Sequence, residues 1–147
     1  MVDWKRVAID DLRSYALQKD SLASTKERAE SIAKRLQSPA GGGYDREPVM
    51  CGSSTVEDRW IAGIVEKELL WEAYETTAQH IARVEHGLSV LTDDERLALE
   101  LFYVRRPARY IDELCDRLCV ERAAVYKIKD RALEKFTLAM FGQRYSE

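Results

Sequence analysis

The chain has 147 residues with 46% hydrophobic and 33% charged side chains, a composition typical of one helix-rich domain or of a small domain joined to an extended helical part. No apolar run approaches the roughly 20 residues that a membrane-spanning helix needs, and the N-terminus lacks an apolar signal core, so we expect a cytoplasmic protein with no membrane partner. Three cysteines favour free thiols over a disulfide.

The charge is distributed unevenly along a chain whose net charge is −3. Residues 1–104 hold 13 Lys and Arg against 19 Asp and Glu, whereas residues 105–144 hold 10 against 6. The negative net charge argues against nucleic acid as a partner, but the distribution of charge along the chain does not. The basic C-terminal segment is where contacts to phosphate groups are expected.

Residues 3–37 are predicted to form a helix, because apolar side chains recur there at spacings of three and four residues. Lys19 and Lys26 interrupt this stripe. Ser24 with Glu27 has the pattern that caps a fresh helix, so a break near residues 20–24 stays open. We interpret the stripe as a packing face rather than a ligand site.

A loop is predicted at residues 38–54, where two prolines and four glycines exclude regular structure. The glycines at 41–43 raise the alternative of a phosphate cradle. That alternative fails because the run lacks the lysine and threonine of such a loop and no strand precedes it.

Residues 55–90 are predicted to form the longest helix, with Thr55 and Asp58 as a capping pair at its start. Two apolar stripes follow, one of them interrupted by Lys67 and Glu85, and together they are too wide for a single neighbouring helix. The first helix, folded back antiparallel across the loop, covers one side, and a second chain or the C-terminal domain must cover the other. We expect self-association through this helix. The residues predicted to carry it are Trp60, Ile64, Trp71 and Tyr74.

The sequence predicts neither a metal site nor a catalytic site. His80 and His86 lie six residues apart and do not share a helix face, and Cys115 and Cys119 are explained by the packing pattern described below. No Ser/His/Asp or Cys/His set and no carboxylate cluster appears beyond what helix faces explain. We therefore predict a protein that is not an enzyme and binds no cofactor.

A further helix is predicted at residues 92–105. Thr92 and Glu95 form a capping box at its start, and Pro107 ends it. Gly87, just before this segment, is expected to mark a bend in the chain.

Two short helices joined by a tight turn are predicted at residues 110–118 and 121–136, with the second prolonged as far as Gly142. The positions that such a helix-turn-helix buries are all apolar: Leu114, Leu118, Val120, Val125 and Ile128. Cys119 takes the turn position usually held by glycine, so we expect a positive φ there at a cost of roughly 1 kcal/mol. A steep crossing of the two helices leaves the second exposed on its far side.

The segment 91–136 resembles region four of the sigma-70 family, the part of bacterial sigma factors that reads the −35 promoter element. The run VERAAVYKIKDRALEKF carries the resemblance most clearly. It implies that the last helix enters the major groove and that its outward residues read bases: Arg122, Ala123, Tyr126 and Lys127. Ala123 stands where sigma factors commonly carry an acidic reader, so the recognised sequence should differ from a −35 element.

Five more basic residues on this segment are interpreted as phosphate contacts: Arg105, Arg106, Arg109, Lys129 and Arg131. The alternative is that these side chains, and those of the base-reading set, are merely solvated charges.

The layout as a whole is similar to the small late-transcription regulators of phages and prophages of the ArpU/RinA type. Val125-Tyr126-Lys127 followed by Ala132-Leu133 carries this second resemblance. It implies a DNA-binding transcriptional regulator that activates phage late genes. RNA polymerase is a further partner that the resemblance leaves open.

We therefore predict an all-α protein. Residues 1–90 form a coiled-coil-like helical hairpin for homo-oligomerisation, and residues 91–142 form a sigma region 4-like helix-turn-helix domain that binds double-stranded DNA. Two alternatives stay open: a phage small terminase subunit that recognises packaging DNA, and a module that binds RNA polymerase or a sigma factor without touching DNA. The operator, the sign of regulation and the oligomer number do not follow from the sequence.

Overall fold

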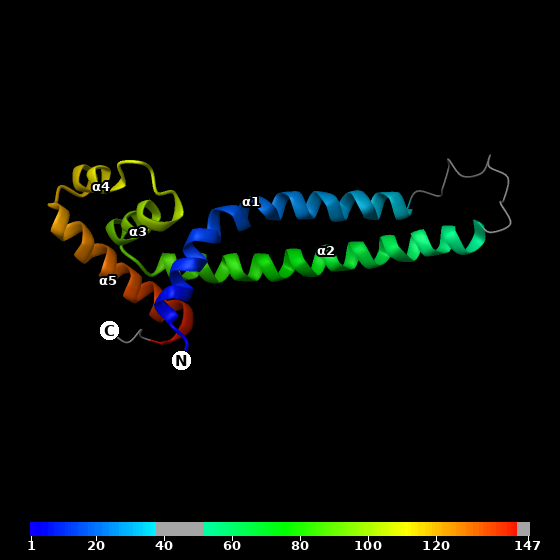
Figure 1. Ribbon diagram of the computed structural model, residues 1–147, viewed down its shortest axis with the longest axis horizontal. Coiled ribbons are helices and arrows are strands. Elements are labelled where there is room, and N and C mark those ends of the chain that lie inside the picture. The colour runs from blue at the N-terminus through cyan, green and yellow to red at the C-terminus, as the bar shows by residue number, and fades with distance from the viewer. Residues whose placement is uncertain (38–51, 144–147) are drawn as a thin grey trace. The chain divides into compact units, whose positions relative to one another are not determined.

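The computed structural model describes the backbone of residues 1–37 and 52–143 and the side chains of 1–37 and 56–143. All regular structure in these ranges is helical, which confirms the predicted all-α class (Figure 1). The elements are α1 (Trp4–Gln37), α2 (Gly52–Ser89), α3 (Asp93–Leu99), a π-helical turn (Glu100–Val104), α4 (Tyr110–Leu118) and α5 (Arg122–Phe141). No helix in the described ranges is long and apolar enough to cross a membrane.

The helix α1 runs without interruption, so the break left open near residues 20–24 is absent. That stretch contains no glycine or proline, and serine and threonine lower helix propensity by only a few tenths of a kcal/mol, roughly. A capping pattern therefore does not force a new helix where the preceding residues are already helical.

The start of α2 differs from the prediction. The helix begins at Gly52, so the last three residues of the predicted loop 38–54 are helical and Thr55 lies inside the helix instead of capping it. Capping signatures mark where a helix can begin, and glycine and serine permit an earlier start. The glycines at 41–43 lie outside the described residues.

Two compact units make up the chain, one formed by residues 1–19 with 79–147 and the other by residues 20–78. We call them the C-terminal unit and the hairpin unit. This division cuts through α1 and α2, because the ends of both helices share a core with the C-terminal helices. The predicted division into residues 1–90 and 91–142 stays a prediction.

In the hairpin unit, α1 and α2 run close together (Figure 1). Ala29 and Ile32 of α1 are buried. A Cβ atom on Gly63 would lie 3.1 Å from Leu36 Cδ2, so this glycine allows a near approach of the two helices.

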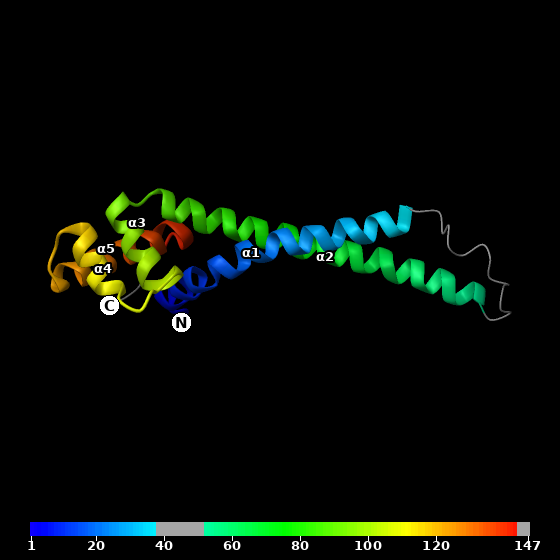
Figure 2. The ribbon, with the colours of Figure 1, turned by 90° about the horizontal axis from the view of Figure 1, so that it is seen from above.

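The C-terminal unit has two neighbouring hydrophobic clusters, and α3, α4 and α5 lie together in both ribbon views (Figures 1 and 2). The larger cluster gathers buried side chains from α1, α2, α3, α5 and the link before α3: Ala8, Leu12, Val84, Leu91, Leu99, Ala132, Leu133 and Phe136. Trp4 packs on Phe141 with ring centroids 5.0 Å apart. This cluster holds the start of α1 and the end of α2 against α5.

The predicted bend at Gly87 is wrong, because Gly87 lies inside α2 and is buried. A Cβ atom there would lie 2.8 Å from Phe136 Cε2 and 3.1 Å from Met140 Cγ. The glycine is thus a point of close contact with α5, where any larger side chain would force the two helices apart.

Gly87→Ala is expected to destabilise the C-terminal unit, although alanine favours a helix. The new methyl group would meet Phe136, which is fully buried and cannot move aside without disturbing the core. Overpacking costs about 1–3 kcal/mol, against a gain in helix propensity of about 1 kcal/mol. Urea unfolding followed by circular dichroism measures the change.

Gly63→Ala is the matched control in the hairpin unit. Its methyl group would meet only the end of the Leu36 side chain, which is half-buried and free to shift. We expect unchanged or slightly higher stability for this variant. Equal losses from the two substitutions would contradict the role assigned to Phe136.

Candidate nucleic-acid interface

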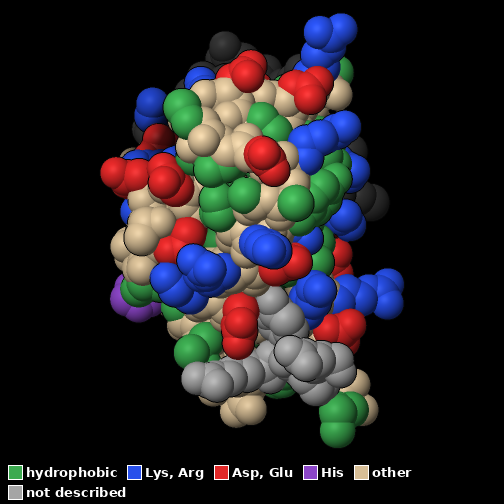
Figure 3. Space-filling view, turned by 90° about the vertical axis from the view of Figure 1, so that its left-hand side faces the viewer, with side chains coloured by type: hydrophobic (Ala, Val, Ile, Leu, Met, Phe, Trp, Pro, Cys, Tyr) green, Lys and Arg blue, Asp and Glu red, His purple; other side chains and the backbone are tan. Residues whose placement is uncertain are grey.

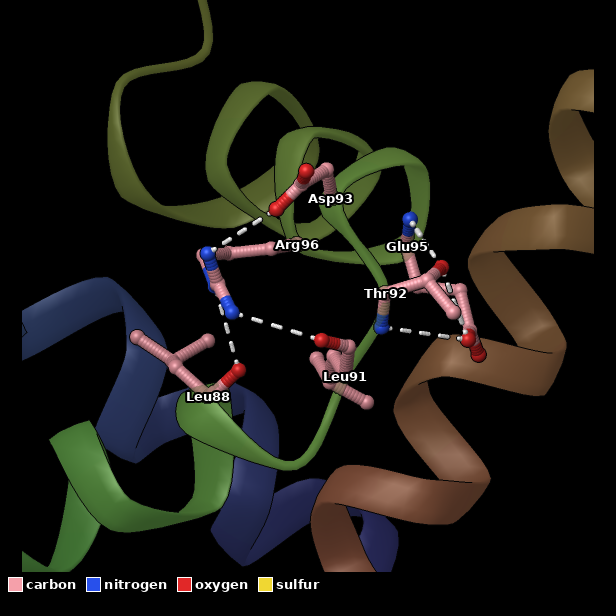
Figure 4. A network of polar contacts seen from close by, with 6 residues as sticks. All are labelled: Leu88, Leu91, Thr92, Asp93, Glu95 and Arg96. Atoms are coloured by element: carbon pink, nitrogen blue, oxygen red, sulfur yellow. Dashed lines mark hydrogen bonds and ion pairs between the residues drawn. The ribbon is translucent and has the colours of Figure 1, made fainter.

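The link between α2 and α3 positions the basic segment, and its hydrogen bonds are shown in Figure 4. Thr92 Oγ1 accepts from the backbone N–H of Glu95 at 3.3 Å, and Glu95 Oε1 accepts from the backbone N–H of Thr92 at 3.4 Å, which confirms the predicted capping box. Arg96 donates to the carbonyl oxygens of Leu88 and Leu91 at 3.2 and 3.3 Å. Leu88 lies in the last turn of α2 and Leu91 in the link that follows, so Arg96 ties the start of α3 to the end of α2.

Glu95 also anchors α5. Lys135 Nζ lies 2.9 Å from Glu95 Oε1, while Glu95 Oε2 is buried and accepts from no described residue. Burial alone would raise the pKa of Glu95, but the hydrogen bonds from Lys135 and Thr92 outweigh it and hold the pKa below the usual glutamate value. The carboxylate form of Glu95 therefore joins the start of α3 to the second half of α5.

The predicted helix 92–105 is divided in the structure. An α-helix covers Asp93–Leu99, and a π-helical turn covers Glu100–Val104. The backbone N–H of Arg105 donates to the carbonyl oxygen of Glu100 at 2.9 Å, which closes that turn. Turns of this π-helical type are rare in proteins, and many of those that occur lie at functional sites.

The first of the next two helices and the turn after it are as predicted, and the second helix begins one residue later than predicted, at Arg122. The helix α4 covers Tyr110–Leu118, Cys119 has the expected positive φ of 55°, and α5 runs to Phe141 before Gly142 at φ 65°. All five predicted packing positions belong to the second cluster, together with Phe102: Leu114 and Val125 are buried, and Leu118, Val120 and Ile128 are partly buried. The turn is therefore held by its own apolar side chains.

The four residues predicted to read bases are all exposed on the first turns of α5. Arg122 and Lys127 form no ion pair with any described residue. Tyr126 is 43% exposed and packs edge-on against Phe102, with ring centroids 5.8 Å apart. The cluster beneath thus holds one side of the Tyr126 ring and leaves part of the side chain accessible.

Four of the five predicted phosphate contacts, all of them arginines, divide into two groups. Arg109 and Arg131 are exposed and unpaired among the described residues. Arg105 forms an ion pair with Glu100, and Arg106, at a positive φ of 38°, lies 5.2 Å from the centroid of the Tyr110 ring. These two arginines have partners that a phosphate group would compete with.

Lys129 is the predicted contact with the least solvent access. Its side chain is only 16% exposed, Nζ lies 2.6 Å from Asp130 Oδ1, and the same atom lies 5.5 Å from the Phe102 ring centroid. The side chain packs over the aromatic cluster instead of extending into solvent. Its position favours a role in holding Phe102 and Tyr126 over a direct phosphate contact.

The sequence pattern did not single out Arg13 of α1. Burial raises the pKa of the Tyr103 hydroxyl, while the charges of Lys129, Arg13 and Arg106 oppose that shift and the charge of Asp130 reinforces it. The charge of Arg13 therefore acts on Tyr103, just before the basic segment, and its side chain is exposed. No local signal could have found it, because its neighbour lies 90 residues further along the chain.

The surface around these residues carries both signs of charge. On the face drawn in Figure 3, Lys and Arg side chains are interspersed with Asp and Glu and with hydrophobic groups. Within α4, Glu113 pairs with Arg117 at 3.5 Å, and Asp112 and Asp116 are exposed. Contacts to a polyanion would thus be made at separate basic points and not across one continuous basic patch.

The histidines and cysteines of the described residues have ordinary surroundings. His80 Nε2 lies 3.3 Å from Asp11 Oδ1, and Cys115 and Cys119 are free thiols. No three His, Cys, Asp or Glu side chains in the described ranges come together as metal ligands. No protein-family model matches the chain, and neither a curated protein nor a solved structure shows a significant match.

Glu95→Gln is expected to lower stability at pH 7 by about 1 kcal/mol, because the bond to Lys135 loses its ionic character. The folded-state pKa of Glu95 is depressed, so the carboxylate stabilises the fold above the usual glutamate pKa. This contribution disappears as the pH falls through the folded-state pKa. Urea unfolding at several pH values should show the difference between wild type and variant shrinking in acid.

Glu134→Gln is the control for this series, since Glu134 neighbours Lys135 but is exposed and unpaired among the described residues. Its stability should follow that of the wild type at every pH. A Glu95→Gln difference that stayed constant into acid would contradict the ionic role of Glu95.

Proposed function

We propose that the chain is a sequence-specific DNA-binding transcriptional regulator of the phage or prophage late-gene type. In this proposal α4, the turn at Cys119 and α5 act as a helix-turn-helix similar to sigma region four, with α5 entering the major groove. The observation that carries the proposal is that α5 has one buried side and one exposed side. Its packing positions are covered by the second cluster, while the predicted base-reading positions are all exposed.

The exposed positions are suited to reading base edges. Arg122, Ala123, Tyr126 and Lys127 are spaced so that they share one face of α5, at the end that enters a groove first in helix-turn-helix proteins. Arg122 and Lys127 have no ionic partner among the described residues, so they can donate to guanine O6 and N7.

The helix is also held firmly behind that face. Ala132, Leu133 and Phe136 are fully buried, and Lys135 bonds to Glu95. Rigid support of this kind fixes the backbone of the reading helix, so binding carries no entropy cost for ordering the helix itself. The exposed Arg109 and Arg131 are the best candidates for phosphate contacts that set the register.

Self-association forms part of the proposal, because a dimer would present two reading helices to two half-sites. Of the residues predicted to carry it, Trp60 is 55% exposed, whereas Ile64, Trp71 and Tyr74 are half-buried. Trp71 and Tyr74 contact each other edge-on at 5.5 Å. Trp60 is therefore the side chain with the most surface to bury against a second copy.

Trp60→Ser is expected to weaken self-association at micromolar concentration, because it removes that apolar surface. Sedimentation velocity of wild type and variant measures the change. Tyr74→Phe serves as a control that keeps the apolar area. A wild-type protein that sediments as a monomer would contradict this part of the proposal.

Arg122→Ala is expected to cost about 1–3 kcal/mol of binding at the cognate site and to relax specificity at one base. The cognate site comes first from selection of bound duplexes out of random or genomic fragments. Arg109→Ala and Arg131→Ala should instead weaken binding to all duplexes about equally, and each should flatten the log–log salt dependence by about one unit. Salt titrations on cognate and random duplexes compare the two classes of variant.

An Arg122→Ala protein that binds every duplex as the wild type does would show that α5 is not the reading helix. A protein-interaction module without DNA contacts is the second candidate function, favoured by the acidic side chains among the basic ones in Figure 3. Failure of the wild type to bind any duplex at low salt would favour that candidate.

A further inference from the structure

An apolar stripe runs along the exposed side of α2 in the hairpin unit. Ile61, Val65 and Leu69 are four residues apart and share one face, and their exposed fractions are 54%, 47% and 60%. Gly63 faces Leu36 of α1. At 3.6 residues per turn, positions 61 and 65 lie roughly 160° around the helix from Gly63. The α2 stripe, as we call these three residues, therefore lies on the side away from α1.

The charged residues around the α2 stripe are all acidic. Five exposed carboxylates lie beside it, none in an ion pair with a described residue: Glu57, Asp58, Glu68, Glu72 and Glu75. Arg59 and Lys67 are the basic residues of α2 in this unit, and each is four positions from Gly63. They therefore lie on the α1 side and do not neutralise the carboxylates.

Self-association through Trp60, which lies roughly 100° around α2 from Ile61, uses a different face, and a second copy of the hairpin unit does not complement the α2 stripe itself. Pairing one α2 stripe with another would bring the carboxylates of both chains together at low dielectric. The α1 segment of the unit, residues 20–37, carries basic side chains but exposes no large hydrophobic side chain among its described residues. As a partner for the α2 stripe, α2 of a second copy would thus offer apolar side chains but a like charge. Its α1 segment would offer basic side chains but no large exposed apolar ones.

We propose that the α2 stripe binds an amphipathic helix of another protein, with an apolar ridge flanked by Lys and Arg. Side chains spaced four apart form the ridges that interlock when two helices pack at a steep angle. The stripe is about 12 Å long at 1.5 Å per residue, which corresponds to about two turns of the partner helix. Basic flanks would pair with the carboxylates nearest the stripe, such as Glu68 and Glu72, and the ridge would cover the three apolar side chains. This inference is independent of DNA binding.

The test uses the full-length protein and a synthetic helical peptide with leucine at every fourth position and lysine on both flanks. Two comparison peptides have glutamate in place of lysine or the same residues in scrambled order. We expect the lysine-flanked peptide to bind tighter than either by on the order of tenfold. Val65→Ser with Leu69→Ser should abolish this preference while circular dichroism shows unchanged helix content.

A charge reversal makes the test specific. Glu68→Lys with Glu72→Lys should shift the preference to the glutamate-flanked peptide. Glu27→Lys with Glu30→Lys makes the same change in charge at exposed positions of α1, and it should leave the preference for lysine intact. Duplex binding by the uncharged Val65→Ser with Leu69→Ser variant should follow that of the wild type, so failure here is distinguishable from failure of the proposed function.

Three outcomes would overturn the proposal. Equal binding of the ordered and scrambled lysine peptides would show only general attraction to acidic protein. Loss of preference in the Glu27 and Glu30 variant would place the binding elsewhere. Conversion of an oligomer to a monomer by Val65→Ser with Leu69→Ser, seen in sedimentation, would show that a second copy of the chain covers the stripe.

Discussion

The close contact of Phe136 with the backbone of α2 at Gly87 constrains the placement of α5, together with the bond between Lys135 and Glu95. Only glycine leaves room for this ring, since a Cβ atom would lie 2.8 Å from it. With Phe136 seated there, the fully buried Ala132 and Leu133 align with the first core cluster, and the end of α5 is fixed. The exposed first turns of α5 then extend from a rigid base, which is the condition that any reading helix must meet.

Local patterns in the sequence predicted the second half of the chain well. The turn at Cys119, the capping box of Thr92 and Glu95, and the stop at Gly142 each depend on side chains within about four residues of one another. A sequence shows such neighbours directly. The bounds of α4 and the five packing positions around the turn follow from the same short-range spacing.

What the sequence could not predict depends on partners far along the chain. Gly87 suggested a bend, because its partner Phe136 lies 49 residues away. Lys19 and Glu85 each interrupted a predicted apolar stripe, yet they lie 3.4 Å apart, and Tyr15 donates to the same carboxylate at 2.8 Å. These two charged residues, which interrupt the apolar stripes of α1 and α2, therefore form a single polar contact between these helices. Arg13 is comparable, since only the fold brings it near the basic segment.

The uneven charge of the chain acquires a structural meaning from these positions. The hairpin unit directs unpaired carboxylates outward beside apolar side chains, while α5 directs unpaired Arg122 and Lys127 outward. A polyanion is repelled by the first surface and attracted by the second, and a basic helix has the opposite preference. The two surfaces therefore discriminate between classes of partner by charge before any specific contact forms. The net charge of −3 for the whole chain reveals neither the acidic surface of the hairpin unit nor the basic surface of α5.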